Sequence, residues 1–124
     1  MKLLKIDSIM LRVKDITKSA SFYEKTLGMK RVWKDAERGM AGFTFSDSDS
    51  EIVIHDNNDI PSPSFSFLVN DVTKFCKDYA KTGNRILVQP MEVRTGKYAV
   101  LSDPNGNAIP IIDLTKFGGK PRYD

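Results

Sequence analysis

The chain has 124 residues, of which 40% are hydrophobic and 28% charged, as is typical of one globular domain with a buried core. Its formal net charge is +3 and its acidic and basic residues are interleaved, so we expect neither nucleic acid nor a membrane as a partner. No apolar run approaches the roughly 18 residues of a membrane span. The single cysteine, Cys76, excludes an internal disulfide and favours a reducing, cytoplasmic location.

The first half of the chain predicts a strand, a helix and three further strands. Residues 4–13 are interpreted as a strand rather than a signal peptide, because Asp7 interrupts the apolar run and no small-residue cleavage site follows. Asp15 is a plausible N-cap for a helix that Gly28 would end. The three strands that follow are expected at residues 30–35, 39–46 and 51–56.

The second half predicts the same order of elements. A strand at residues 64–69 precedes a helix that Asp71 would cap and Gly83 would end. The apolar face of this helix includes Cys76, which we interpret as a buried, inert thiol. The last three strands are expected at residues 85–93, 97–102 and 108–113. Between the final two, "DPNG" (103–106) suits a type I turn.

The two halves are also similar in sequence. Residues 13–26 (VKDITKSASFYEKT) align with residues 69–82 (VNDVTKFCKDYAKT) at an offset of 56, and seven of the fourteen pairs are identical. Internal repetition of this kind indicates a duplicated structural module. We therefore predict an α+β fold in one domain, residues 1–124, in which two tandem βαβββ modules form a concave mixed sheet around a cavity. The modules would span about residues 1–56 and 64–113, followed by a tail at 114–124.

Three segments resemble a known family in order and spacing: "IDSIMLRVKDITKSASFYEKTLGMK" (6–30), "FLVNDV" (67–72) and "DPNGNAI" (103–109). Together they are similar to the glyoxalase / bleomycin-resistance / extradiol dioxygenase superfamily, which has the vicinal oxygen chelate fold. The resemblance covers nearly the whole chain and implies the fold. It does not imply one activity, because this superfamily carries out very different chemistries.

The resemblance also implies where a metal would be held, because metal-dependent members usually take ligands from the first, fourth, fifth and eighth strands. Serine hydroxyls are poor ligands for a divalent metal, proline offers no ligand atom, and the single histidine excludes a triad with two histidines. We therefore expect no metal cofactor, with a divalent metal as the alternative. The matching positions are Ser8, Val53 (or, in another register, Glu51 or His55), Ser64 and Pro110.

Side chains on the same strand faces as these positions are candidates for a ligand pocket, since successive strand residues point to opposite faces. Met10, Trp33 and Tyr98 would suit a flat, apolar ligand, because stacking adds to burial. Arg12 could anchor an anionic ligand, cover the pocket rim or pair with an acid. The complete set of predicted ligand-binding residues is Ser8, Met10, Arg12, Trp33, Val53, Ser64, Ser66, Tyr98 and Pro110.

His55 and Glu51 are the candidates for acid–base chemistry. His55 is the one side chain that titrates near neutral pH without help, so it could act as a general base or bind a ligand through a hydrogen bond. The alternative is a half-exposed residue at the end of a strand. Glu51 is the first residue of its predicted strand. It could act as a catalytic acid or base, or it could be a carboxylate exposed to solvent.

Three functions are compatible with these residues. The first is a metal-free member of the superfamily that binds a small organic molecule; resemblance to bleomycin-resistance proteins implies sequestration of a drug or metabolite by a homodimer, hence antibiotic resistance. The positive net charge argues for a neutral, aromatic or anionic ligand rather than a cationic one. The alternative is a metal-dependent glyoxalase- or dioxygenase-type lyase or oxidoreductase, with a metal on Glu51 or His55 and ligands from a second chain. A protein-interaction module without a pocket is a third reading.

Overall fold

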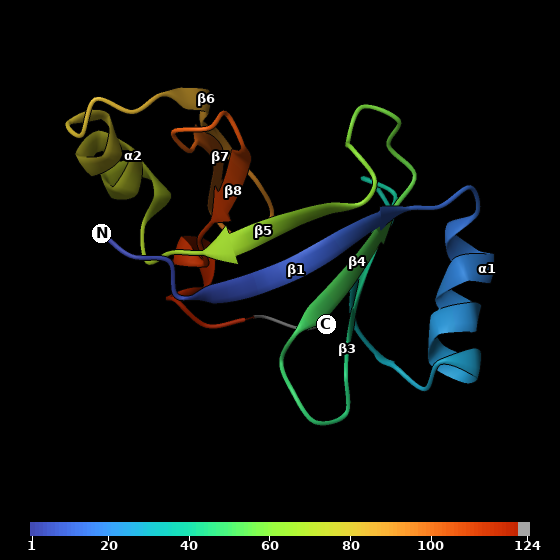
Figure 1. The fold of residues 1–124 in the computed structure, drawn as a ribbon. Coiled ribbons are helices and arrows are strands. Elements are labelled where there is room, and N and C mark those ends of the chain that lie inside the picture. Colours follow the sequence, from blue (N-terminus) through green and yellow to red (C-terminus); the bar gives the residue numbers. More distant parts are fainter. Residues whose placement is uncertain (122–124) are drawn as a thin grey trace. The chain divides into compact units, whose positions relative to one another are not determined.

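The computed structural model describes residues 1–121 and has the predicted α+β composition, with eight strands and two principal helices (Figure 1). Within the described residues, every helix is too short or too polar to cross a membrane. The chain divides into two compact units. The first unit is Ser8–Phe65, and the second combines Met1–Asp7 with Ser66–Pro121.

The first unit is built on the strand order β2-β3-β4-β1. Strand β4 runs parallel to β1 and antiparallel to β3, and β3 pairs antiparallel with β2. A helix, α1, follows β1 and continues as a π-helical segment, η1. The bounds are β1 (Lys5–Arg12), α1 (Ile16–Ser21), η1 (Phe22–Thr26), β2 (Lys30–Asp35), β3 (Met40–Thr44) and β4 (Glu51–His55).

The helix of the first unit begins and ends where the sequence predicts. The Asp15 carboxylate accepts a hydrogen bond from the Lys18 backbone N–H at 3.0 Å, as an N-cap does. Gly28 has a φ of 69°, the left-handed conformation in which glycine commonly ends a helix. The helix packs its apolar side on one face of the sheet. That core consists of Met29, Ala41, Phe43 and Ile54, with Val13, Ile16, Ala20, Tyr23 and Ile52 packed against it.

The second unit has the strand order β5-β8-β7-β6 and one longer helix, α2. Its first residues include Leu4, whose backbone N–H donates to the Leu68 carbonyl at 2.9 Å. The core against α2 consists of Val69, Val72, Cys76, Ala99, Leu101 and Ile111. The bounds are β5 (Ser64–Leu68), α2 (Val72–Ala80), β6 (Ile86–Glu92), β7 (Lys97–Ser102), β8 (Ala108–Ile112) and the 3-10 turn η2 (Thr115–Phe117).

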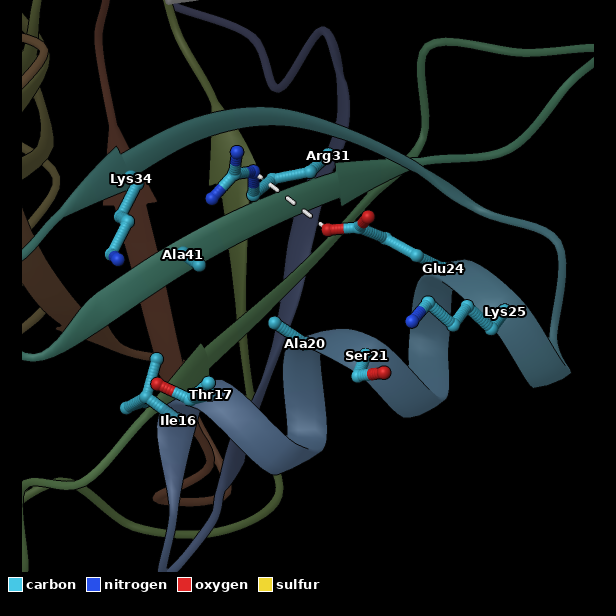
Figure 2. Close-up of a pocket in the computed structure, with 9 residues that line it drawn as sticks. All are labelled: Ile16, Thr17, Ala20, Ser21, Glu24, Lys25, Arg31, Lys34 and Ala41. Carbon is cyan, nitrogen blue, oxygen red and sulfur yellow. Dashed lines mark ion pairs between the residues drawn. The ribbon is translucent and has the colours of Figure 1, made fainter.

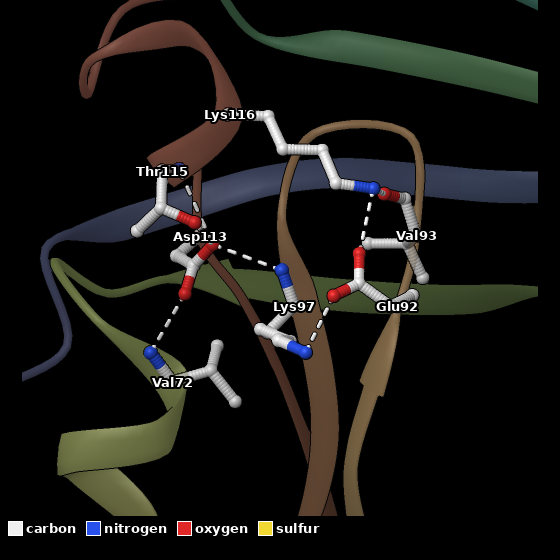
Figure 3. A network of polar contacts seen from close by, with 7 residues as sticks. All are labelled: Val72, Glu92, Val93, Lys97, Asp113, Thr115 and Lys116. Atoms are coloured by element: carbon white, nitrogen blue, oxygen red, sulfur yellow. Dashed lines mark hydrogen bonds and ion pairs between the residues drawn. The ribbon is translucent and has the colours of Figure 1, made fainter.

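A buried carboxylate connects three elements of the second unit. The Asp113 side chain is fully buried, and it accepts hydrogen bonds from the backbone N–H groups of Val72 at 2.8 Å and Lys97 at 2.9 Å. It also accepts from the Thr115 hydroxyl at 2.8 Å (Figure 3). Gly96 leaves room for it, since a Cβ there would lie 2.0 Å from Asp113 Oδ1. The carboxylate therefore joins the starts of α2, β7 and η2.

An exposed ion-pair cluster lies beside this buried group. The Glu92 carboxylate contacts Lys97 Nζ at 2.5 Å and Lys116 Nζ at 2.7 Å (Figure 3). Hydrogen bonds from Lys116 and then Lys97 lower the pKa of Glu92 to about 2. Lys116 Nζ also donates to the Val93 carbonyl at 2.7 Å, so the cluster connects η2 to the end of β6.

Pro110 lies in the middle of β8, opposite Val100 of β7. The Asp113 backbone N–H donates to the Lys97 carbonyl at 3.1 Å. Because hydrogen-bonded pairs alternate along an antiparallel ladder, the pair at Pro110 is not hydrogen-bonded, and the proline nitrogen points away from β7. On that other side, the ladder with β5 begins only at Ile111. The missing N–H therefore leaves both ladders intact.

The predicted elements agree closely with the structure. The "DPNG" turn is confirmed by a 3.0 Å hydrogen bond from the Gly106 N–H to the Asp103 carbonyl, and Cys76 is buried, at 4% exposure. The first predicted helix differs in form, because it passes from α- to π-helical geometry at Phe22. The organisation as one domain stays a prediction, and residues 122–124 of the predicted tail lie outside the described residues.

Candidate functional site

The pairing of β4 with β1 places the first-unit candidates on a common face. Of the three candidates for the fourth-strand position, Glu51 is the one directly opposite Ser8. Residues two apart on a strand share a face, so Ser8 and Glu51 each begin a row of side chains along their own strand. The face is formed by the pairs Ser8–Glu51, Met10–Val53 and Arg12–His55.

The middle of this face is an apolar cluster. Trp33 is 5% exposed and Val53 4% exposed, and Met10 packs against them. Val32 and Met40 complete the cluster. It lies on the face opposite α1, because its strand positions alternate with those that pack against the helix. Three predicted ligand-binding residues, Met10, Trp33 and Val53, are therefore brought together.

A β-bulge in β2 directs Trp33 to this face. Arg31 pairs with Phe43 and Trp33 pairs with Gly42, which leaves Val32 as an extra residue between them. A bulge changes the face on which the following side chains lie, so Val32 and Trp33 both join the apolar cluster. Gly42 lies directly under the indole, since a Cβ at this position would be 1.9 Å from Trp33 Nε1. Sequence reasoning missed Gly42, although a glycine inside a strand often marks a bulge or a close approach.

Glu51 orients the tryptophan. The indole Nε1–H of Trp33 donates to Glu51 Oε2 at 2.7 Å. A hydrogen bond to an ionised carboxylate is stronger than one between neutral groups, and it fixes the plane of the ring over Gly42. Glu51 is half-buried rather than fully solvated. The structure therefore gives this carboxylate a positioning contact with the aromatic side chain.

His55 is fully buried, which corrects the alternative of a half-exposed residue at a strand end. Its Nδ1 accepts a hydrogen bond from the Asn57 backbone N–H at 3.2 Å, so the neutral ring carries its proton on Nε2. Nε2 is a buried atom that lacks a partner within residues 1–121. Burial lowers the pKa of His55, and the nearby Arg12 lowers it further, against smaller opposing effects of Asp56 and Asn57. The imidazole is therefore a neutral hydrogen-bond donor.

Arg12 holds the segment that follows β4. Its guanidinium donates to the Ile60 carbonyl at 2.7 Å, and its backbone N–H donates to the Ser62 hydroxyl at 2.9 Å. The residue is exposed. A contact with a loop carbonyl is not one of the three predicted roles, so the structure adds it, and the predicted roles of Arg12 stay predictions.

Three further candidates lie in the second unit, on the face opposite α2. Tyr98 and Pro110 share the face that alternates with the helix-packed positions of β7 and β8. Leu68 pairs with Ile112, which is opposite Tyr98, so Leu68 lies on the same face as Tyr98. Ser66 lies two residues before Leu68 and therefore shares that face. Burial raises the pKa of Tyr98. Ser64 is half-buried at the start of β5 and belongs to the first unit.

A comparison with protein-family models decides the family. The model of the Glyoxalase/Bleomycin resistance protein/Dioxygenase superfamily matches residues 5–111. The chain belongs to this superfamily. This confirms the resemblance drawn from the three sequence segments. No curated protein sequence matches the chain.

Solved structures have the same superfamily fold. Methylmalonyl-CoA epimerase from Streptomyces coelicolor, in complex with 2-nitronate-propionyl-CoA, is 20% identical with a TM-score of 0.65, over 89% of this chain and 96% of that one. The Mycobacterium tuberculosis epimerase is 17% identical with a TM-score of 0.64, over 88% and 87%. A hypothetical protein from Bacillus halodurans is 17% identical with a TM-score of 0.62, over 86% and 91%. At these identities, the likeness shows the fold alone.

The residues at the superfamily's metal-ligand positions do not fit a divalent ion. Ser8 and Ser64 offer neutral hydroxyls, Pro110 offers no donor, and the Glu51 carboxylate is bound to the Trp33 indole. Within the part of the chain that the structure describes, no three His, Cys, Asp or Glu side chains lie close enough together to hold a metal ion. The residues that the resemblance places at these positions are therefore a poor donor set for a divalent metal.

Proposed function

We propose that this protein binds a small, flat and largely apolar organic molecule without a metal, on the face that carries Met10, Trp33, Val53 and His55. The observation that carries the proposal is the buried His55 Nε2–H, which has no hydrogen-bond partner among residues 1–121 and lies two residues along β4 from Val53. Buried polar groups are almost always hydrogen-bonded, and a donor without a partner in residues 1–121, on the same face as Trp33, suits a ligand that supplies the acceptor.

The chemistry of the face defines the ligand class. The Trp33 indole is 5% exposed, so a ligand stacks on it only when the side chains packed over it move, and the flexible thioether of Met10 allows such a movement. The His55 donor requires a carbonyl, carboxylate or similar acceptor on the ligand, and the net charge of +3 disfavours a cation. A neutral or anionic aromatic molecule with one carbonyl-type acceptor meets these conditions.

Sequestration is the biochemical role that needs only these residues. Holding a drug or metabolite requires binding and no bond-making step, and we propose that a homodimer does so in the cytoplasm. The Streptomyces coelicolor structural neighbour is in complex with 2-nitronate-propionyl-CoA. Acyl-coenzyme A esters contain a carbonyl acceptor but are larger and more polar than the ligand class proposed for this chain, so they serve as a comparison in the test.

Trp33 is the only tryptophan of the chain, so its fluorescence reports directly on this face. The test titrates the full-length protein with aromatic carboxylates, aromatic ketones and acyl-coenzyme A esters, and follows Trp33 emission and the melting temperature. Binding is expected to change both. His55→Leu, which removes the donor at similar volume, is expected to weaken binding roughly tenfold, whereas His55→Gln keeps a donor and retains more of the affinity.

Metal content is measured in parallel by plasma mass spectrometry, before and after incubation with nickel, zinc, manganese and iron(II). We expect no metal at near one equivalent per chain after dialysis. Stoichiometric metal would contradict the proposal and favour the alternative of a metal-dependent lyase or oxidoreductase. Equal affinities of His55→Leu and the wild-type protein would remove the role assigned to the imidazole.

A further inference from the structure

A hollow of the first unit lies on the face of the sheet opposite Trp33, between the helix and strands β2 and β3. It encloses about 280 Å³. Figure 2 shows Arg31 and Lys34 on the strand side, with Glu24 and Lys25 on the helix side. Apolar side chains, including Ala20 and Ala41, line it as well. We call this hollow the basic groove; none of its residues belongs to the Trp33 face.

The β-bulge of β2 explains why two cations meet in the basic groove. In a regular strand, Arg31 and Lys34 are three residues apart and would point to opposite faces. Val32 is the extra residue of the bulge, so Arg31 pairs with Phe43 and Lys34 pairs with Ala41. Both partners belong to the core that packs against α1. The same irregularity that sends Trp33 to one face therefore sends both cations to the other.

Charge in the basic groove is strongly unbalanced. Three cationic side chains, Lys25, Arg31 and Lys34, line it together with one carboxylate, Glu24. Arg31 Nε lies 3.7 Å from Glu24 Oε1, and these side chains are 47% and 40% exposed, so their pair contributes little. An anion placed among the three cations would meet two positive charges that Glu24 does not balance.

We propose that the basic groove binds a phosphate monoester with a small organic group. Its two negative charges match the local excess of two positive charges, and a planar guanidinium such as that of Arg31 binds phosphate oxygens through two parallel hydrogen bonds. The organic group lies against the apolar wall at Ala20 and Ala41. A volume of 280 Å³ is at the lower end of the range of ligand sites, so the organic group is no larger than one ring.

The experiment uses full-length protein labelled with ¹⁵N and titrated with phenyl phosphate, with phenol as the neutral analogue and inorganic phosphate as the analogue without a ring. Phenyl phosphate is expected to give saturable shifts of the Ala20, Arg31 and Ala41 amide signals, and to bind more weakly as salt increases. Phenol is expected not to bind, and inorganic phosphate to bind more weakly than the ester.

Matched charge removals identify the site. The double variant Arg31→Gln/Lys34→Gln is expected to lower the affinity for phenyl phosphate at least tenfold, and both positions are exposed, so the fold is retained. The double variant Lys74→Gln/Lys77→Gln removes two exposed cations of α2, outside the groove, and is expected to leave the affinity unchanged. Equal losses in both proteins would overturn the proposal, because they would indicate a general charge effect. Shifts located outside the groove, or phenol binding as tightly as the ester, would overturn it too.

Discussion

Gly42→Ala is the most direct test of how the Trp33 face is built. The added methyl group would lie 1.9 Å from Trp33 Nε1 and 2.3 Å from Cε2, distances at which atoms overlap. Nothing in the backbone of Gly42 itself disfavours alanine, since its φ is not positive. The clash can be relieved only if the indole moves away from the strand. That movement would break the 2.7 Å hydrogen bond to Glu51.

The expected loss of stability combines the cost of overpacking around Trp33, the cost of the lost hydrogen bond and a smaller gain in backbone entropy. Trp33 is 5% exposed, and overpacking a well-filled core costs about 1–3 kcal/mol. Loss of a hydrogen bond to a charged group adds about 1.5–3 kcal/mol. Alanine in a strand interior offsets roughly 0.5–1 kcal/mol, because it loses less backbone entropy than glycine. Together these contributions predict that Gly42→Ala lowers the free energy of unfolding by about 2–5 kcal/mol.

A double-mutant cycle separates this clash from any other effect. Urea unfolding followed by far-ultraviolet circular dichroism is measured for wild type, Gly42→Ala, Trp33→Ala and the double variant. With Trp33 replaced, the added methyl group has nothing to displace, so Gly42→Ala should be neutral or stabilising in that background. The reasoning fails if Gly42→Ala destabilises both backgrounds equally, or neither.

Three further predictions concern buried polar groups. Because the pKa of His55 is lowered below 6.5 in the folded state, the unfolded chain binds the extra proton first, so stability should fall as pH decreases below about 6.5. In urea unfolding, the free energy of unfolding of His55→Gln should decrease less over the same pH range than that of the wild-type protein. Equal pH dependence in the two proteins would contradict the assignment. Asp113→Asn should lower the free energy of unfolding by about 2–4 kcal/mol, because the new NH₂ donor would face the backbone N–H donor of Val72 or Lys97. A near-neutral effect in calorimetry would refute this prediction. Cys76, whose thiol pKa is raised by burial, should react with a thiol reagent only as fast as the protein opens, and native and urea-unfolded rates that coincide would disprove its burial.

Local features of the fold were predictable because their causes lie within a few residues of one another. The Asp15 and Asp71 carboxylates accept from backbone N–H groups three residues away, at Lys18 and Lys74. Turns are equally local, as the hydrogen bond that closes the "DPNG" turn illustrates. The duplication added long-range information, since it placed the same elements in the same order in both halves.

The candidate site was predictable only where the strands are regular. Met10 and Val53 are neighbours on the predicted face because β1 and β4 pair without interruption. In β2, the bulge at Val32 changes the alternation, so the face occupied by Trp33 could not be derived from its position alone. A glycine at residue 42 was the available signal, but its meaning depends on which strand packs across it.

The sequence alone determined the superfamily and the order of the elements, because these depend on residue identity and on interactions close along the chain. Tertiary structure alone decided that Glu51 holds the Trp33 indole across 18 residues of sequence, and that His55 is buried with Nε2 as its donor. Register, bulges and burial arise from contacts between segments far apart in the chain. A single side chain acquires its charge state and its partners only when those segments meet.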